Sequence, residues 1–323
     1  MKQELQNQIE AQWNSRTKPQ GSLGRLEDLA RDYCMIRGTA HPKLETLGLY
    51  LYAADHGVTD EGISLYPKTV TRQMVANFEA GGAAVNVLAR KHGVAVQVID
   101  AGVGVGTRNF AKVAAMTVDE CRDRIEAGRS DARDAANRYD LVGVGEMGIG
   151  NTTSAAAILA AISGRSGAEV AGRGTGLDDR GVHHKGQVID AAIALHGLSG
   201  ASALRILEAV GGFEIARMTG FLMEAGKLRL PVMLDGFITG AAALVATKIE
   251  AATREVLFFS HRSAERGHGL MLDALDGDPL LELGMRLGEG SGAILGMHLV
   301  ACAINLYLDM ASFESAAVSR SEL

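Results

Sequence analysis

Short apolar runs alternate along the chain with longer segments in which apolar residues recur every three or four positions. The short runs are typical of buried strands and the longer segments of helices. Strands are predicted at 47–54, 95–100, 141–144, 231–234 and 256–259. Helices are predicted at 69–80, 83–91, 119–139, 153–163, 178–198, 203–210, 217–227, 239–249 and 292–309, and at both ends of residues 1–40 around a loop at 17–24. Residues 105–120 fit neither pattern.

This alternation predicts an α/β fold with a mostly parallel sheet that has helices on both faces. Each predicted strand ends in a polar or glycine-containing cluster, namely Asp55-His56-Gly57, Asp100-Ala101-Gly102, Gly145-Glu146, Asp235-Gly236 and Ser260-His261. Ligands of such sheets bind outside the carboxyl ends of the strands, so we expect the clusters to line one edge. For Asp100 and Asp235, an equally open alternative is that they cap helices or accept hydrogen bonds from loop amides.

Glu289 lies between two glycines in the run Arg286-Leu287-Gly288-Glu289-Gly290-Ser291-Gly292. A carboxylate on a glycine-rich turn next to apolar chain is well placed for a raised pKa and for general-base chemistry. The alternative is a solvated glutamate on a surface turn. A second instance favours the catalytic interpretation, because a predicted glycine turn within 145–153 also holds a glutamate, Glu146, after an apolar run.

A run of alternating glycines, Gly172–Asp179, precedes a predicted helix. Exposed amides at the start of a helix form an anion site, and Lys185 in that helix is able to supply a positive charge to a phosphate. The alternative is a tight loop followed by a solvated lysine. The run matches neither the Walker A loop nor the dinucleotide fingerprint.

Composition narrows the classes of function. The chain has 323 residues, of which 47% are hydrophobic, which is enough for one large α/β domain with or without a smaller part. The 40 glycines and 5 prolines indicate many tight turns. A net charge of −6 without a basic block argues against nucleic-acid binding.

The N-terminus is polar, and the three cysteines, Cys34, Cys121 and Cys302, lack CxxC spacing. Both features predict a cytoplasmic protein with reduced thiols. We find no apolar run of about 18 residues, so no membrane span is predicted.

The histidines do not predict a metal site. His56, His261, His268 and the pair His183-His184 lack HxxxH spacing, and no GxSxG motif marks a nucleophilic serine. Carboxylates, backbone amides and one lysine remain at the predicted edge. They suit a reaction in which a nucleophile loses a proton and the substrate carries a phosphate, without a metal, a cofactor or a covalent intermediate.

The motifs as a set resemble one family. They are Lys18–Glu27, Ala54–Val58, Pro67 with Val70-Thr71 and Asn77-Phe78, Gly143–Thr153, Gly172–Asp179, Leu234–Phe237, Ser260-His261 with Ser263–Glu265, and Arg286–Ala293. In this order, over nearly the whole chain, they resemble the nicotinate-nucleotide–dimethylbenzimidazole phosphoribosyltransferases, which make the lower-ligand nucleotide of cobalamin. The resemblance implies that a benzimidazole nitrogen attacks C1′ of nicotinate mononucleotide, giving nicotinate and α-ribazole 5′-phosphate with inversion.

The resemblance also implies an architecture. A Rossmann-like large domain at 46–290 holds the site, and a small helical domain combines residues 1–45 with 291–323. Family members are homodimers in which the small domain covers the partner's site.

The resemblance assigns roles to residues. Glu289 is the implied general base, and Glu146 lies near the base and ribose as the second catalytic residue. The residues expected at the phosphoribosyl group are Gly148, Gly174, Thr175, Lys185, Ser263 and Gly290. The residues expected around the base are Tyr66, Met74, Met147 and Leu287.

One departure leaves the identity of the base open. Some relatives carry Ser and Gln where this chain has Tyr66 and Met74. Either the two side chains form a flatter, more apolar wall that suits adenine or a phenol as acceptor, or they only pack the rim. A non-catalytic nucleotide-binding paralogue is a third possibility, and retention of both Glu146 and Glu289 argues against it.

Overall fold

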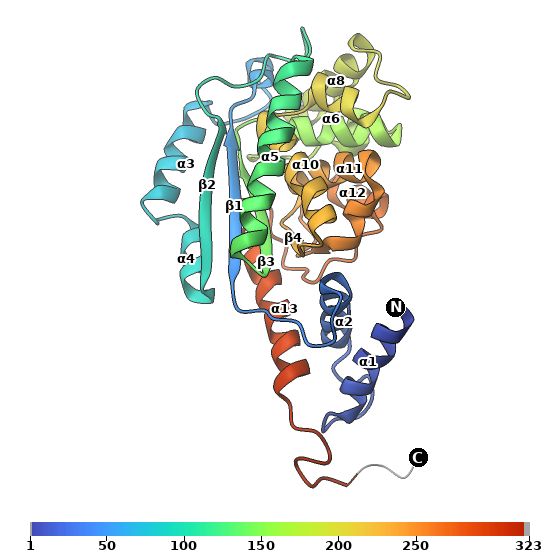
Figure 1. Cartoon of the computed structure of the whole chain (residues 1–323). Helices are drawn as coiled ribbons and strands as arrows, with labels where there is room; N and C mark the ends of the chain where they lie inside the picture. Colours follow the sequence, from blue (N-terminus) through green and yellow to red (C-terminus); the bar gives the residue numbers. More distant parts are fainter. Residues whose placement is uncertain (1, 320–323) are drawn as a thin grey trace.

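Five parallel strands form one sheet in the computed structural model, which describes residues 2–319 (Figure 1). Their order is β2-β1-β3-β4-β5, with bounds β1 Leu47–Ala54, β2 Val94–Gly102, β3 Leu141–Met147, β4 Val232–Leu234 and β5 Leu257–Phe259. All neighbouring strands pair in parallel, so their carboxyl ends meet at one edge. The predicted α/β fold with a parallel sheet is confirmed.

Helices cover both faces of the sheet, which explains why its central strands are apolar at nearly every position. On one face lies α10 (Phe213–Leu228), whose Phe221 ring is centred 5.3 Å from the ring of Tyr50 in β1. On the other face lies α13 (Ser291–Asp309), whose Ala293 and Met297 pack against Gly143 of β3.

The remaining helices follow the predicted order. They are α1 Lys2–Ser15, α2 Arg25–Arg37, α3 Thr69–Glu79, α4 Ala84–His92, α5 Val118–Arg138, α6 Asn151–Ser163, α7 Gly167–Val170, α8 Asp179–Leu195, α9 Ala203–Val210, α11 Phe237–Ile249 and α12 His268–Leu275, with short 3-10 helices η1 Gly57–Glu61 and η2 Ala251–Val256. The two 3-10 helices, α7 and α12 were not predicted. They are short, and glycines at 267 and 269 interrupt the apolar pattern of α12.

Several predicted boundaries are shifted, and two of the shifts have a clear physical reason. The helix predicted at 217–227 already begins at Phe213, because Phe213, Glu214 and Ile215 are buried directly after the glycine pair 211–212. Strand β3 extends to Met147, because Glu146 and Met147 continue the pairing with β1. Glu146 therefore lies in a strand and not in the predicted glycine turn.

The N- and C-terminal helices meet away from the sheet. The far end of α13 packs on α1 and α2, where the ring of Tyr307 is centred 5.1 Å from that of Trp13 and its hydroxyl donates to the carbonyl of Ala40 (Figure 1). The division of the chain at 1–45, 46–290 and 291–323 stays a prediction. Helix α13 contacts both the sheet and the terminal helices, so it belongs to both parts.

The prediction that no apolar run is long enough to cross a membrane is wrong for α13. Its 19 residues meet that length and composition, and it is the one such helix among residues 2–319. The run has no charged side chain until Asp309. Because 56% of its apolar window is buried inside the fold, α13 resembles the core helix of a globular protein.

Helices α5 and α10 cross at two glycines that have no room for a side chain. A Cβ at Gly128 would lie 1.8 Å from the carbonyl oxygen of Arg217, and one at Gly220 would lie 1.9 Å from that of Ile125. We expect Gly128→Ala to lower the free energy of unfolding by about 1–3 kcal/mol through overpacking. Urea denaturation measures this loss. The control, Ser130→Ala on the exposed side of α5, should leave stability nearly unchanged.

Candidate active site

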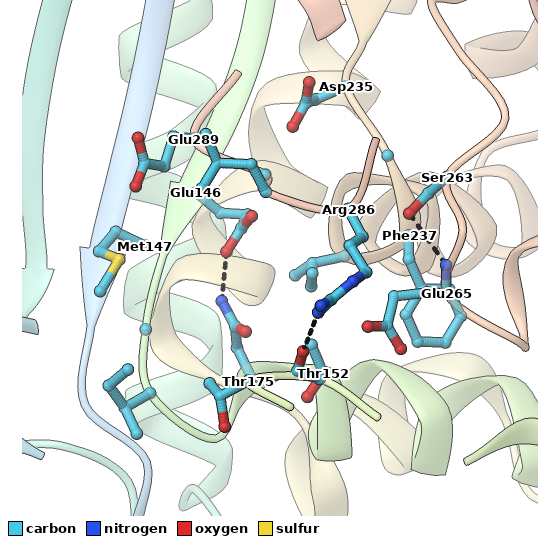
Figure 2. Close-up of a pocket in the computed structure, with 18 of the residues that line it drawn as sticks. Glu146, Met147, Thr152, Thr175, Asp235, Phe237, Ser263, Glu265, Arg286 and Glu289 are labelled. Atoms are coloured by element: carbon cyan, nitrogen blue, oxygen red, sulfur yellow. Dashed lines mark hydrogen bonds between the residues drawn. The ribbon is translucent and has the colours of Figure 1, made fainter. Parts of the chain in front are cut away.

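A cavity of about 430 Å³ opens at the carboxyl edge of the sheet (Figure 2). Glu146 at the end of β3, Asp235 after β4 and His261 after β5 line it, as the strand-end pattern predicts. The clusters after β1 and β2 follow strands that end at the same edge, but their residues are not among those that line the cavity. Asp55 instead accepts a hydrogen bond from the amide of Gly104 in the loop after β2, and Asp100 accepts hydrogen bonds from the amides of Gly102 at the end of β2 and of Val103.

The two glycine-flanked glutamates are brought together by contacts between backbones. A Cβ at Gly288 would lie 2.2 Å from a carboxylate oxygen of Glu146, and a Cβ at Gly145 would lie 2.7 Å from the nitrogen of Gly290. The glycines therefore let the turn before α13 lie directly on the end of β3. This close approach accounts for the glycine before each glutamate.

Glu289 sits in the middle of this turn with an unusual backbone. Gly288, Glu289 and Gly290 have φ of 82°, 62° and 79°, so the left-handed region is occupied three times in succession. Glycine adopts this region freely, but a residue with a Cβ is strained there by about 1–2 kcal/mol. Such strain in a non-glycine residue is common at functional sites.

Both glutamates are buried and hold their protons more tightly than usual. Glu289 is 7% exposed, and burial followed by the charge of Asp235 raises its pKa to about 7. Glu146 is 5% exposed, and the same two causes raise its pKa to about 8 although Asn151 donates a hydrogen bond to it. At neutral pH Glu289 is thus able to accept a proton, while Glu146 is mostly protonated.

Asp235 accepts hydrogen bonds from amides at the start of α13, so it caps a helix, which confirms the alternative interpretation of this residue. The donors are the amides of Gly290, Gly292 and Ala293, at 3.1, 2.7 and 3.1 Å. The amide of Gly290 is thereby occupied, and Gly290 is not among the lining residues. A contact of this amide with a phosphate, as predicted from sequence, is not supported.

One end of the cavity is suited to an anion. Gly148, Gly174, Thr175 and Ser263 line the cavity as predicted, together with the first residues of α6. A helix N-terminus favours negative charge.

Lys185 is completely buried behind this end and donates to the hydroxyl of Thr152 at 2.8 Å. A Cβ at Gly174 would lie 3.3 Å from its ammonium group. Burial lowers the pKa of Lys185 to about 8, and the negative charge of Glu265 opposes this shift.

The other end of the cavity is apolar. Tyr66, Met74, Met147 and Leu287, the residues predicted around the base, all line the cavity. Val70, Ile149 and Ile238 add further apolar lining, and Phe237 lies across the cavity from Met147, beside Ser263 and Glu265 (Figure 2). Tyr66 and Leu287 are 54% and 56% exposed, which puts them at the mouth.

Three polar residues that line the cavity, Arg286, Glu265 and Asn151, were given no role from the sequence. Arg286 donates to the carbonyl of Gly174 at 2.9 Å and so joins the turn before α13 to the loop before α8 (Figure 2). Glu265 has one buried carboxylate oxygen without a hydrogen-bond partner among the described residues. Asn151 restrains Glu146. Arg286 and Asn151 lie within the glycine motifs, so their positions there were the available signal.

Histidines and acidic residues do not gather around a possible metal position. Within residues 2–319, no group of three or more His, Cys, Asp or Glu side chains has an arrangement that could hold a metal ion. His268 accepts a hydrogen bond from the amide of Ser263, and burial lowers its pKa to about 3.

Comparisons with known proteins agree with this geometry. The model of a family described as DBI_PRT, Phosphoribosyltransferase, matches residues 1–318. A protein of Chlorobium chlorochromatii named nicotinate-nucleotide–dimethylbenzimidazole phosphoribosyltransferase is 45% identical, covering 98% of this chain and 94% of the relative. A protein of the same name from Bradyrhizobium diazoefficiens is 47% identical, covering 94% of this chain and 91% of the relative.

Solved structures are similar over the same length. The crystal structure of CobT from Thermus thermophilus superposes with a TM-score of 0.93 at 41% identity, covering 98% of this chain and 100% of that chain. A second structure from the same organism, titled as the dimethylbenzimidazole phosphoribosyltransferase, has a TM-score of 0.91 at 40% identity and covers 99% of this chain and 100% of that chain.

The left-handed backbone at Glu289 predicts a stability difference between two substitutions. Glu289→Gly and Glu289→Ala both remove the carboxylate, but only glycine relieves the strain at φ 62°. We expect the glycine variant to be more stable than the alanine variant by about 1 kcal/mol. Thermal unfolding of the two purified variants measures this. Equal stabilities would contradict a strained conformation.

Proposed function

Because the chain belongs to the family of nicotinate-nucleotide–dimethylbenzimidazole phosphoribosyltransferases, we propose that the cavity at the carboxyl edge of its sheet is where this pentosyl transfer takes place. The activity moves the phosphoribosyl group of nicotinate mononucleotide to dimethylbenzimidazole and releases nicotinate. The observation that carries the placement is Glu289, a buried carboxylate with a pKa of about 7 between an apolar wall and an anion-binding end.

The two ends of the cavity set the orientation of the substrates. The flat base lies against the apolar wall with Met74 and Met147, and Tyr66 and Leu287 close the mouth. The phosphate lies at the start of α6 near Gly174 and Thr175, with the charge of Lys185 behind it. The ribose then lies between the two ends, which brings C1′ toward the base.

The reaction forms one bond and breaks one at C1′. A ring nitrogen of the base attacks C1′ while the bond from C1′ to nicotinate breaks on the opposite face, which gives inversion. The bonding electrons return to the positively charged pyridine nitrogen, so nicotinate leaves without a proton from the protein. The attacking base becomes positively charged, and Glu289 removes its remaining N–H proton.

Glu146 supports this step as a neutral carboxylic acid. Its pKa of about 8 keeps it mostly protonated at pH 7, so it adds little negative charge beside Glu289. A protonated carboxyl is also able to donate a hydrogen bond to a ribose hydroxyl.

The homodimer and the cytoplasmic location are further parts of the proposal. Leu65, Tyr66 and Leu287 are exposed by more than half, and two of them line the mouth of the cavity. An apolar rim of this kind supports a second subunit that covers the mouth. Light scattering of the purified protein measures the assembly.

Removing the proposed base tests the placement. In Glu289→Gln we expect formation of α-ribazole phosphate from nicotinate mononucleotide and dimethylbenzimidazole to fall at least about 10²-fold, with binding of the mononucleotide retained. In the wild-type enzyme, kcat/KM should fall as the pH drops below about 7, because Glu289 then becomes protonated. Chromatography of the products measures both effects. Near-normal turnover in Glu289→Gln would overturn the assignment.

Lys185 tests the phosphate end. Lys185→Ala should raise KM for the mononucleotide more than KM for the base, because it removes a charge near the phosphate only. In the wild-type enzyme, KM for the mononucleotide should rise above about pH 8, where Lys185 loses its proton. Steady-state kinetics with each substrate varied separate the two effects. The control is Lys248→Ala at the exposed end of α11, and equal effects on both substrates would contradict the phosphate role.

A further inference from the structure

Asp235 is a buried carboxylate at the end of β4 that contacts the start of α13. One of its oxygens accepts the amides of Gly292 and Ala293, and the other accepts the amide of Gly290. Amides at the start of a helix, and amides in successive left-handed residues, converge on one point and form an anion site. In this fold the anion comes from the protein itself, since the carboxylate of Asp235 fills the site.

The amides that donate hydrogen bonds to Asp235 follow closely after Glu289 in the chain. They belong to the residue directly after Glu289 and to the first turn of α13, so Asp235 clamps the chain on the helical side of the glutamate. On the other side, the carbonyl of Gly288 accepts hydrogen bonds from the amide and hydroxyl of Ser291. A strained residue keeps its conformation only where the surroundings hold it. Asp235 lies outside the turn and holds it by accepting hydrogen bonds from the amides of Gly290, Gly292 and Ala293.

We propose that Asp235 is the positioning residue of the active site: its carboxylate anchors the turn that presents Glu289 to the cavity and places a negative charge beside it. This inference rests on the proposed function of Glu289 as the base. Asp235 does not touch the reacting atoms in this scheme, because its oxygens are engaged with the amides of α13.

Several titratable and charged side chains surround Glu289, and Asp235 is one of them. Glu289 shares the cavity with Glu146 from β3, with Asp235 and His261 from the ends of β4 and β5, and with Arg286 from its own turn. After burial, the charge of Asp235 is the factor that raises the pKa of Glu289. Burial raises the pKa of Asp235 itself, and His261 at 4.0 Å and the three amides oppose this shift. A negative neighbour makes Glu289 a stronger base at neutral pH.

Replacing Asp235 by asparagine removes the charge and keeps a side-chain oxygen that accepts amide hydrogen bonds. The pKa of Glu289 should then fall, so the acidic limb of the pH dependence of kcat/KM should move to lower pH by about one unit. Above this limb we expect kcat to fall about tenfold, because the base is weaker and its turn is held less firmly. KM for the mononucleotide should change little, since the phosphate end lies on other loops.

The matched control is Asp140→Asn. Asp140 likewise accepts two backbone amides, those of Glu45 and Thr46 at 2.9 and 3.0 Å, but it lies at the opposite edge of the sheet. This variant should keep the wild-type acidic limb. If Asp235→Asn does not fold, Asp235→Ser, which is smaller and also uncharged, carries the same expectation.

The outcomes separate two failures. A folded, uncharged variant at position 235 that keeps the wild-type acidic limb and kcat would overturn the role of Asp235. A wild-type enzyme that forms no α-ribazole phosphate would overturn the proposed function instead. A limb that moves in the Asp235 variant and stays in Asp140→Asn supports the inference.

Discussion

The active site depends on a contact between two backbones, where the end of β3 touches the turn before α13. A Cβ at Gly145 would overlap the backbone of Glu289 and Gly290, and a Cβ at Gly288 would overlap the carboxylate of Glu146. The contact places two buried carboxyl groups in one cavity. Burial raises the pKa of both carboxyl groups, and at neutral pH Glu289 is still able to accept a proton.

Much of the fold was predictable from periodicity. The strands, their parallel arrangement and most helices follow from apolar runs that alternate with helical spacing. The errors lie where tertiary contacts extend or create an element. Glu146 continues β3 because Tyr52 of β1 pairs with it, and a polar residue directly after a glycine gave no local sign of this. Short helix α12 forms although glycines interrupt its pattern.

The site was only partly predictable. The glycine motifs identified the two glutamates, and the family resemblance implied most of the other lining residues. They did not show that the amide of Gly290 is used by Asp235, nor that Lys185 is buried behind Thr152. Both facts depend on how distant segments pack. The clusters after β1 and β2 lie at the predicted edge but outside the cavity. Their aspartates accept hydrogen bonds from backbone amides, which is the alternative that sequence left open for Asp100.

Helix α13 has a mechanical consequence. Its 19 residues span about 28 Å, from the turn that holds Glu289 to the packing of Tyr307 against Trp13. A helix of this length buried along one side behaves as a stiff rod. The terminal helices and the turn that holds Glu289 therefore contact opposite ends of the same rigid helix. A tilt of the terminal helices would move α13 and with it the backbone of this turn.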